Sequence, residues 1–296
     1  MKDEITREER VDNLKGMGWM TLAMLGFALA DTFIKLTLDA LPVGQVIAFF
    51  GFGGALIFGV WAKATGDRIF YRALFTLAFW VRLASEVVGT VCFVIALSRI
   101  DLSLLSAIIQ ANPLLVTLGA ALFLGASVGW RRWVAIGIGL IGVLMIVRPG
   151  MAGFNVDTLW AVGATFGLVG RDLATRAIPR QASNLLLAAW GFVAAGVAGL
   201  GILVVSGGAA MPEGAMWGLL LCALLCALVA YYAITAAMRI GEIAVVTPFR
   251  YTRLVFALIL AFFVFGERPD QWTLIGAAIV IATGLFTLWR ERVAAT

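Results

Sequence analysis

Long apolar segments, separated by short polar ones, follow one another along the whole chain. A helix that crosses the hydrocarbon core of a bilayer needs about 20 mostly apolar residues. Cutting the sequence at its charges and turn residues gives ten such segments, at residues 16–38, 43–62, 73–98, 102–125, 132–148, 157–176, 183–206, 213–238, 242–265 and 271–290. The pattern therefore predicts an all-α polytopic membrane protein with ten transmembrane helices.

The composition excludes a soluble protein. Of the 296 residues, 62% are hydrophobic and 13% are charged, whereas soluble domains carry about 25% charged residues. The mean hydropathy is +1.01. The N-terminal sequence MKDEITREERVDNLKG mixes both signs of charge and precedes a long apolar segment, unlike the basic start and short apolar stretch of a signal peptide. We therefore expect the first span to remain in the mature protein.

Lys and Arg are distributed unevenly between the two sets of loops. Three of them (Arg99, Arg148 and Arg268) lie on one side, whereas the termini and the loops on their side hold fourteen: Lys2, Arg7, Arg10, Lys15, Lys63, Arg68, Arg72, Arg131, Arg132, Arg176, Arg180, Arg239, Arg290 and Arg292. Because basic residues favour the cytoplasmic side, both termini are predicted to be cytoplasmic. The net charge of +5 includes no basic run suited to nucleic acid. We therefore expect a lipid bilayer and no nucleic acid as partners.

Two stretches of the chain share a charged pattern at a fixed spacing. Asp31-x-x-x-Lys35 recurs 141 residues later as Asp172-x-x-x-Arg176, within GFALADTFIK and GLVGRDLATR. LFLGASVGWRRW aligns with FFVFGERPDQW in the same register. Apolar composition alone does not place acidic, basic and glycine residues in one register, so we infer an internal repeat of five helices.

An odd number of helices in each repeat makes the second copy enter the membrane from the opposite side. Inverted repeats of this kind are common in secondary transporters, whose substrate site lies near the midplane between the halves. We therefore predict two inverted five-helix repeats around a central cavity. The expected organisation is a cytoplasmic N-terminal segment at 1–15, repeats at 16–148 and 157–290, and a cytoplasmic tail at 291–296.

Two prolines, Pro113 and Pro248, fall within the equivalent fourth and ninth spans. A proline inside a helix removes a backbone hydrogen bond, which membrane proteins tolerate where neighbouring helices or a water-filled cavity satisfy the freed group. The same two spans hold the polar stretches SAIIQANP and TPFRYTR. We therefore expect both helices to be broken beside the substrate site.

Charged and polar side chains within the spans are the candidates for that site, because a charge near the bilayer centre costs roughly 2.5–3.5 kcal/mol on insertion scales. At a rise of about 1.5 Å per residue, seven residues lie near the midplane and form the predicted substrate site: Arg82, Glu86, Gln110, Asn112, Arg250, Tyr251 and Arg253. Asp31 and Asp172 lie towards opposite mouths of the bundle. We assign them, with Lys35 and Arg171, to gating or coupling.

Most of these side chains also have a purely structural alternative. For Arg82 and Glu86 it is an i, i+4 ion pair that holds one helix against its neighbours. For Lys35 it is extension to the membrane interface. Pairing with a carboxylate is the alternative to a ligand or gating role for three arginines: Arg171, Arg250 and Arg253.

The charges within the spans show a positive excess, with three acidic and six basic residues. Because unpaired buried charge is costly, the excess favours an anionic or zwitterionic substrate, with amino-acid-like compounds among the candidates. It argues against a cationic multidrug pump, whose site would be led by carboxylates. Trp80, Trp190 and Tyr251 are candidates for a stacking wall.

The chain offers no residues arranged for catalysis. It has no histidine, the commonest metal ligand and proton shuttle, and its three cysteines lack the spacing of a metal or redox site. We therefore expect no metal, no cofactor and no enzymatic activity. The expected coupling partner is a proton, carried by a carboxylate, or a counter-substrate.

The ten spans, the repeat and the segment FGERPDQWTLIGAAIVIATGLFTLWRER resemble the EamA-type transporters of the drug/metabolite transporter superfamily. The resemblance covers residues 16–292; Ala126 stands where the first repeat of that family usually has Glu, and Glu267 retains it in the second. It implies an alternating-access carrier of a small organic metabolite in a bacterial inner (plasma) membrane. The alternatives are an uptake carrier of the same fold for S-adenosylmethionine-type or other metabolites, and a channel-like facilitator.

Overall fold

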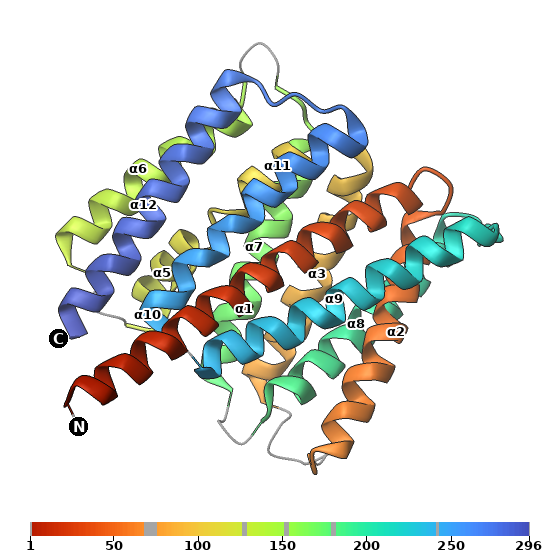
Figure 1. The fold of residues 1–296 in the computed structure, drawn as a ribbon. Coiled ribbons are helices and arrows are strands. Elements are labelled where there is room, and N and C mark those ends of the chain that lie inside the picture. The colour runs from red at the N-terminus through yellow and green to blue at the C-terminus, as the bar shows by residue number, and fades with distance from the viewer. Residues whose placement is uncertain are drawn as a thin grey trace.

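The computed structural model describes residues 2–67, 76–125, 129–150, 154–178, 182–240 and 243–295, apart from the side chains of 2–10, 243–244 and 291–295. Within these residues the fold is a bundle of helices without strands (Figure 1). The first half contains α1 (Lys2–Thr37), α2 (Val43–Ala64), α3 (Leu77–Arg99), α4 (Leu102–Ile109), α5 (Asn112–Phe123) and α6 (Trp130–Val147). The second half contains α7 (Thr158–Ala177), α8 (Asn184–Val205), α9 (Gly214–Ile240), α10 (Ile243–Val246), the 3-10 helix η2 (Thr247–Tyr251), α11 (Thr252–Phe265) and α12 (Gln271–Ala295).

The helix bounds follow the predicted spans closely, and the all-helical membrane fold is confirmed. In the described part of the chain, nine helical segments are long and apolar enough to cross a membrane. The remaining predicted span is α7, which has 20 residues and carries Arg171, Asp172 and Arg176 in its C-terminal half. Twenty residues extend about 30 Å, which matches the hydrocarbon core. Because α7 packs along α3 within the bundle, it completes the second repeat.

The two broken helices lie where the prolines predicted them. α4 ends at Ile109 and α5 begins at Asn112, with Pro113 in its first turn. In the second repeat, α10, η2 and α11 share one span, and Pro248 lies in the first turn of η2. Proline suits the first turn of a helix because its missing N–H would have no intrahelical acceptor there.

The main contacts between helices are related by the internal repeat, so that each has an equivalent contact between the counterpart helices. α2 packs along α8 and α6 along α12, and each pair joins equivalent helices (Figure 1). α1 packs along α9 as α3 packs along α7. A Cβ atom on Gly26 would lie 3.0 Å from the Cβ of Ala230, and one on Gly167 would lie 2.4 Å from the backbone N of Gly89. Adding 141 to 26 and to 89 gives 167 and 230, so the two crossings use equivalent positions.

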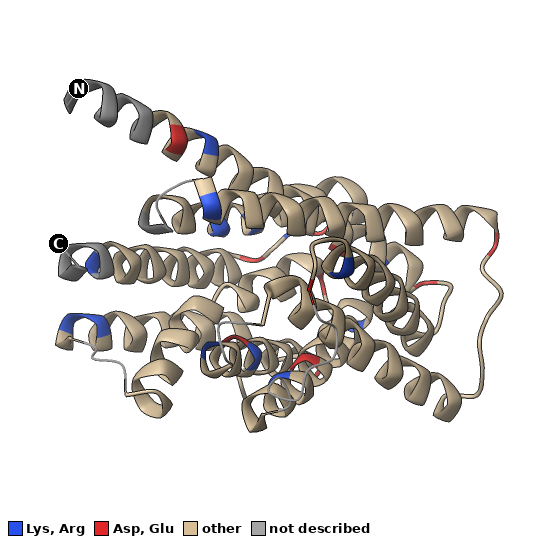
Figure 2. Cartoon of the chain, turned by 90° about the horizontal axis from the view of Figure 1, so that it is seen from below, with Lys and Arg blue, Asp and Glu red and all other residues tan. Residues whose placement is uncertain are grey.

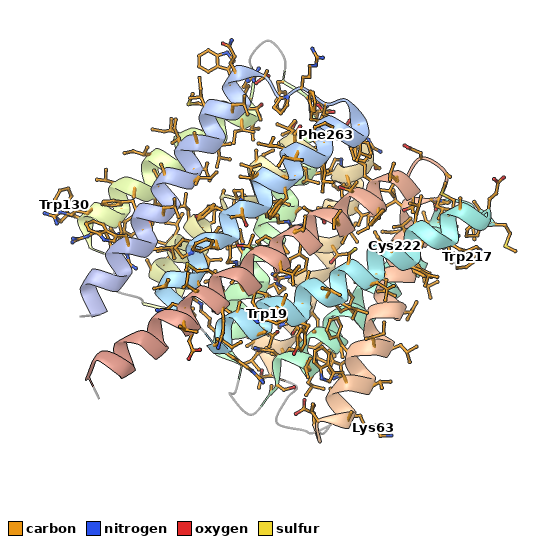
Figure 3. All side chains as sticks on the ribbon, viewed as in Figure 1. Trp19, Lys63, Trp130, Trp217, Cys222 and Phe263 are labelled. Atoms are coloured by element: carbon orange, nitrogen blue, oxygen red, sulfur yellow. The ribbon has the colours of Figure 1, made fainter. Side chains whose placement is uncertain are left out.

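The outer surface of the bundle is apolar, as a surface that faces lipid must be. Figure 3 shows the rings of Trp130 and Trp217 projecting from the periphery. The Phe263 side chain is 78% exposed, and many other large apolar residues share this exposure. Soluble monomers rarely expose contiguous apolar surface on this scale. The chain is therefore a multi-pass membrane protein.

The start of α1 and the end of α12 lie at the same end of the bundle (Figure 1). Figure 2 shows Lys and Arg at that end and also within the bundle. The assignment of this end to the cytoplasm stays a prediction. Four positions that entered the sequence argument, Arg68, Arg72, Ala126 and Arg180, lie outside the described residues.

Gly199→Ala is expected to destabilise the protein, because its Cβ atom would lie 2.5 Å from the backbone N of Ala48 in α2. Overpacking in a close-packed core costs about 1–3 kcal/mol. Gly201→Ala, two residues further along α8, is the matched control, since nothing lies within 4 Å of its Cβ position. Thermal unfolding of both purified variants in detergent measures the difference. Equal midpoints would contradict the close packing of α2 on α8.

An ion pair connects the residue that follows α6, Arg148, with the residue that precedes α12, Asp270. The Arg148 guanidinium donates to both carboxylate oxygens of Asp270, and Asp270 Oδ1 also accepts the backbone N–H of Thr273 at 2.8 Å. These hydrogen bonds lower the pKa of Asp270 to about 2. Because an unfolded Asp titrates near pH 3.9, the pair stabilises the fold above about pH 4 and loses its effect as the pH falls towards 2.

Asp270→Asn should therefore lower the unfolding midpoint at neutral pH, and the difference from the wild type should shrink between about pH 4 and pH 2. Thermal unfolding of the two proteins across this range measures the effect. A difference that is independent of pH would show that the ionised Asp270 carboxylate does not contribute.

Candidate substrate site

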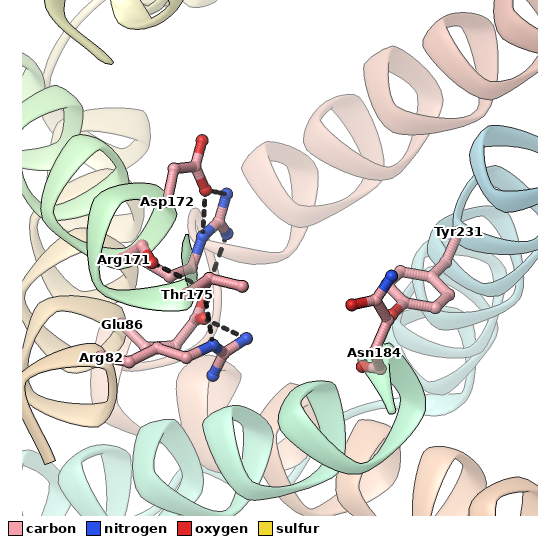
Figure 4. Close-up of polar contacts among 7 residues, drawn as sticks. All are labelled: Arg82, Glu86, Arg171, Asp172, Thr175, Asn184 and Tyr231. Atoms are coloured by element: carbon pink, nitrogen blue, oxygen red, sulfur yellow. Dashed lines mark hydrogen bonds and ion pairs between the residues drawn. The ribbon is translucent and has the colours of Figure 1, made fainter. Parts of the chain in front are cut away.

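Four charged residues of α3 and α7, which we call the charged cluster, form a network inside the bundle (Figure 4). They are Arg82, Glu86, Arg171 and Asp172: Arg82 and Glu86 lie one turn apart on one face of α3, and the adjacent Arg171 and Asp172 of α7 meet this face through Arg171. Arg171 Nη2 lies 2.9 Å from Asp172 Oδ1, and its Nη1 lies 3.5 Å from Glu86 Oε1. Arg82 Nη2 lies 3.7 Å from Glu86 Oε2, and its Nε donates to Thr175 Oγ1 at 3.1 Å.

The break between α4 and α5 brings two amide side chains to the centre of the bundle. Asn112 Nδ2 donates to Asp172 Oδ2 at 3.2 Å, which extends the network to α5. Gln110 Nε2 donates to the backbone carbonyl of Tyr251 at 3.1 Å. Gln110 and Tyr251 are 141 residues apart, so two equivalent residues of the repeats meet. This hydrogen bond therefore marks the axis that relates the two halves.

Asp31, like Asp172 a predicted gate residue, makes the equivalent contact, but with an arginine in place of an amide. Asp31 Oδ2 lies 2.6 Å from Arg253 Nη2, and the Arg253 guanidinium lies over the Phe27 ring at 5.4 Å. Adding 141 to 31 and to 112 gives 172 and 253, so Asp31–Arg253 is the counterpart of Asp172–Asn112. One half thus uses an ion pair where the other uses an amide. The ion pair is the stronger of the two interactions.

The rest of the charged cluster has no charged counterpart at the equivalent crossing of α9 and α1. The positions equivalent to Arg171, Arg82 and Glu86 are the alanines at 30, 223 and 227, at the same offset of 141. α1 nevertheless crosses α9 closely, at Gly26 and Ala230, as α7 crosses α3 at Gly167 and Gly89. The helix crossing therefore does not require the charges, which points to a functional role for the charged cluster.

Several polar atoms near the charged cluster lack a hydrogen-bond partner among the described residues. Arg82 Nη1, Asn112 Oδ1 and the Tyr251 hydroxyl are buried and unpaired. Arg250, on η2, interacts electrostatically with Asp172 but forms no ion pair with any described carboxylate. A buried polar group without a partner costs about 1–3 kcal/mol. These atoms are therefore available to a ligand or to water.

Lys35 and Glu267 form a second charged contact, which we call the latch. Lys35 Nζ donates to the carbonyl oxygens of Leu97 and Ile100 at 3.2 and 2.6 Å and lies 3.7 Å from Glu267 Oε1. Glu267 accepts the first two backbone N–H groups of α4, both at 2.9 Å. A cation at a helix C-terminus and a carboxylate at an N-terminus are both favourable. The latch thus joins α1, the α3–α4 turn and the α11–α12 loop.

A cavity of ≈110 Å³ lies between α1, α2, α3 and α8. Its lining is mostly apolar and includes Phe50, Phe93 and Phe192. Glu86 and Thr90 are its polar members, so the charged cluster reaches the cavity wall. No group of three or more potential metal-ligating side chains occurs in the described part of the chain.

The structure joins the two tiers of residues that the sequence separated. Asp172 contacts Asn112 and Asp31 contacts Arg253, so each predicted gate carboxylate touches a residue assigned to the substrate site. Counting the helix rise locates only the backbone, and a long side chain such as Arg253 covers the remaining distance. The structural alternatives also describe several contacts: Arg82 pairs with Glu86 and Arg171 with carboxylates.

Lys35 and the three aromatic residues predicted to form a stacking wall make contacts that the sequence did not predict. Lys35 has partners within the protein, because the carbonyl oxygens of Leu97 and Ile100 bind it at the C-terminal end of α3. The Tyr251 hydroxyl reaches the backbone of α12, where a Cβ on Gly284 would lie only 1.7 Å away. Trp80 is 56% exposed, and Trp190 packs edge-on against Phe79 at 6.0 Å.

The sequence did not predict three residues that contact the site from other parts of the chain: Thr175, Gly191 and Glu267. The sequence indicates Glu267 only through the family resemblance, because the helix that it caps, α4, lies far away along the chain. Thr175 and the glycine at 191 carried no sequence signal, since their roles depend on the packing of α3 against α7 and α8.

Comparisons with known proteins agree on one family. The chain matches the model of the EamA-like transporter family over residues 14–148 and 158–289. It is 27% identical to a riboflavin transporter of Rhizobium johnstonii, over 93% of this chain and 91% of the relative. It is 25% identical to an S-adenosylmethionine uptake transporter of Rickettsia felis, over 94% of both chains.

Two more distant similarities complete this comparison. A pseudopaline exporter of Pseudomonas aeruginosa is 25% identical over 92% of this chain and 95% of the relative. A crystal structure that is 17% identical superposes with a TM-score of 0.59, over 96% of this chain and 99% of that chain. The latter similarity shows the fold alone.

Removing one partner of the Asp31–Arg253 pair should destabilise the protein by about 3–5 kcal/mol, because it leaves an uncompensated buried charge. Asp31→Ala and Arg253→Ala should each lower the unfolding midpoint, and the double variant should lose less than the sum of both. Asn112→Ala, which removes the equivalent hydrogen bond from an amide, is the control and should cost less. Additive losses for Asp31→Ala and Arg253→Ala would contradict direct pairing.

Proposed function

Because the chain belongs to the EamA-like transporter family, we propose that it is a secondary active transporter of a small organic metabolite. The substrate is anionic or zwitterionic and crosses a bacterial inner membrane by alternating access. Both termini face the cytoplasm in this proposal, in line with the excess of basic residues on their side. The names of the relatives, which are all transporters, support the transporter class.

The one-sided charged cluster is the observation that carries the substrate assignment. The equivalent crossing of α1 and α9 holds alanines at three of its positions, so helix packing does not explain Arg82, Glu86 and Arg171. Arg250 adds a guanidinium that has no ion-pair partner among the described residues. An anionic group of the substrate would supply the missing negative charge. Gln110, Asn112, Tyr251 and Arg253 complete the proposed site at the broken helices.

The latch and the two equivalent aspartate contacts are the proposed gates. Alternating access requires contacts between the halves to close one mouth and open the other. Lys35–Glu267 closes the end at which α3 meets α4, whereas the equivalent positions are Arg176 and Ala126, which offer no carboxylate. Asp31, Lys35, Arg171 and Asp172 thus serve as gating or coupling residues. A proton or a counter-substrate supplies the coupling.

Two alternative functions can be distinguished from this proposal by a counterflow experiment. The first is an uptake carrier for an S-adenosylmethionine-type or other metabolite, a class supported by the name of one group of relatives. The second is a channel-like facilitator. The ion-paired interior and the small cavity favour a carrier, since a conducting pore needs a continuous polar path.

Counterflow of labelled compounds in proteoliposomes tests the proposal. Riboflavin, S-adenosylmethionine and amino acids form the first panel. A carrier shows uptake that is stimulated by unlabelled compound on the opposite side, a channel shows no such stimulation, and an enzyme alters the compound. Absence of stimulated uptake for a compound that nevertheless crosses the membrane would favour the channel.

Arg250→Ala should raise the substrate concentration for half-maximal counterflow about tenfold or more, since a hydrogen bond to a charged group contributes about 1.5–3 kcal/mol. Arg176→Ala is the matched control: Arg176 is an exposed arginine of α7 and should leave the value unchanged. The unfolding midpoint of each variant separates binding from folding. The proposed site is wrong if both Arg250→Ala and Arg253→Ala leave transport affinity unchanged.

A further inference from the structure

The cavity beside the charged cluster is bounded by aromatic side chains from three helices. Phe50 of α2, Phe93 of α3 and Phe192 of α8 all line it. Its volume of ≈110 Å³ lies below the ~300–1,000 Å³ of pockets that enclose a whole drug-sized ligand. The space therefore suits one ring-sized part of a metabolite. Aromatic walls favour a flat ring, which they contact by stacking or edge-to-face packing.

The polar side of this cavity is a specific feature of one half of the bundle. At the offset of 141, the counterparts of Glu86 and Thr90 are Ala227 and Tyr231. The Tyr231 ring packs against Phe58, with centroids 4.4 Å apart. The small threonine and the carboxylate are thus replaced by a large ring and a methyl group. The repeat fold alone does not produce this cavity.

A hydrogen-bond acceptor of the cavity wall, Glu86, has a donor, Arg82, beside it. A Cβ atom on Gly191, which lines the cavity, would lie 3.1 Å from Glu86 Oε2 and 3.2 Å from Arg82 Nη1. Arg82 is only 7% exposed, and its Nη1 has no partner among the described residues. The arginine contacts of Glu86, at 3.5 and 3.7 Å, exceed the ~2.7–2.9 Å of a tight charge-assisted bond. Both groups therefore have unused bonding capacity.

We propose that this cavity binds a flat heteroaromatic ring whose edge carries an N–H group beside a carbonyl group. The N–H donates to Glu86, the carbonyl oxygen accepts from Arg82, and the ring faces the three phenylalanines. A carboxylate edge offers two acceptors and is repelled by Glu86, and a hydrocarbon ring leaves the arginine unpaired. This inference rests on the proposed transport function and names the part of the substrate that the charged cluster recognises.

Thermal unfolding of the purified protein with three bicyclic probes tests the inference. Quinazoline-2,4-dione carries N–H groups beside carbonyl groups, its 1,3-dimethyl derivative lacks the N–H groups, and quinoline has a ring nitrogen acceptor only. We expect the dione to raise the unfolding midpoint. The other two probes should bind at least about tenfold more weakly, because the loss of a hydrogen bond to a charged group has at least that effect. Equal binding of the dimethyl derivative would overturn the proposal.

Two variants locate the binding. Ala195→Leu adds bulk to the cavity lining and should abolish the shift produced by the dione, and Glu86→Ala should weaken it about tenfold or more. Phe263→Ala, on the lipid-facing surface, is the control for a lost aromatic residue and should leave the shift intact. Unchanged dione binding in a folded Ala195→Leu protein would place the ring elsewhere and overturn the proposal.

Counterflow separates this inference from the proposed function. If a metabolite shows stimulated uptake but the dione neither binds nor competes with it, the ring site is wrong and the transport function stands. If the dione binds in the wild type and is lost in Ala195→Leu while no compound shows counterflow, the ring site stands and the transport function fails.

Discussion

A charge enclosed between helices in a membrane has to be compensated within the bundle, because the hydrocarbon core provides no water to solvate it. In this protein the compensating contacts connect the two repeats: Arg253 meets Asp31, Lys35 meets Glu267, and Arg171 meets Glu86. The contacts that neutralise charge are therefore also the contacts that hold the halves together. Any movement of one half against the other has to exchange these partners, which couples the electrostatics of the site to access from either side.

The internal repeat distinguishes residues that support the fold from residues that support function. Both halves keep the close crossings at Gly26 and Gly167 and the break in the fourth helix of the repeat. At the α3–α7 crossing lie Arg82, Glu86 and Arg171, whose counterparts at the α1–α9 crossing are alanines, and Glu86 also lies in the wall of the cavity. A symmetric scaffold thus holds an asymmetric site, to which both repeats contribute residues.

The sequence predicted the helices well because hydrophobic length, charge and proline act locally. The break at Pro113 and the bounds of α2, which begins at Val43, follow directly from such signals. The partners within the site were less predictable. Whether Arg253 reaches Asp31 or a ligand depends on how α1 and α11 face each other, and Glu267 acts on α4 across more than 160 residues of chain. Contacts of this kind depend on the rotation of each helix, which periodicity does not determine in a segment that is apolar on most sides.

The hydrogen bond from Gln110 to Tyr251 has a consequence for how the two copies have diverged. The acceptor is the backbone carbonyl of Tyr251, a group that every residue possesses. Mutation at position 251 therefore leaves the acceptor in place, and glutamine in one copy is sufficient to maintain the contact. The junction of the two halves consequently does not restrict the side chain at 251. An aromatic residue at position 251 is therefore compatible with the joint between the repeats.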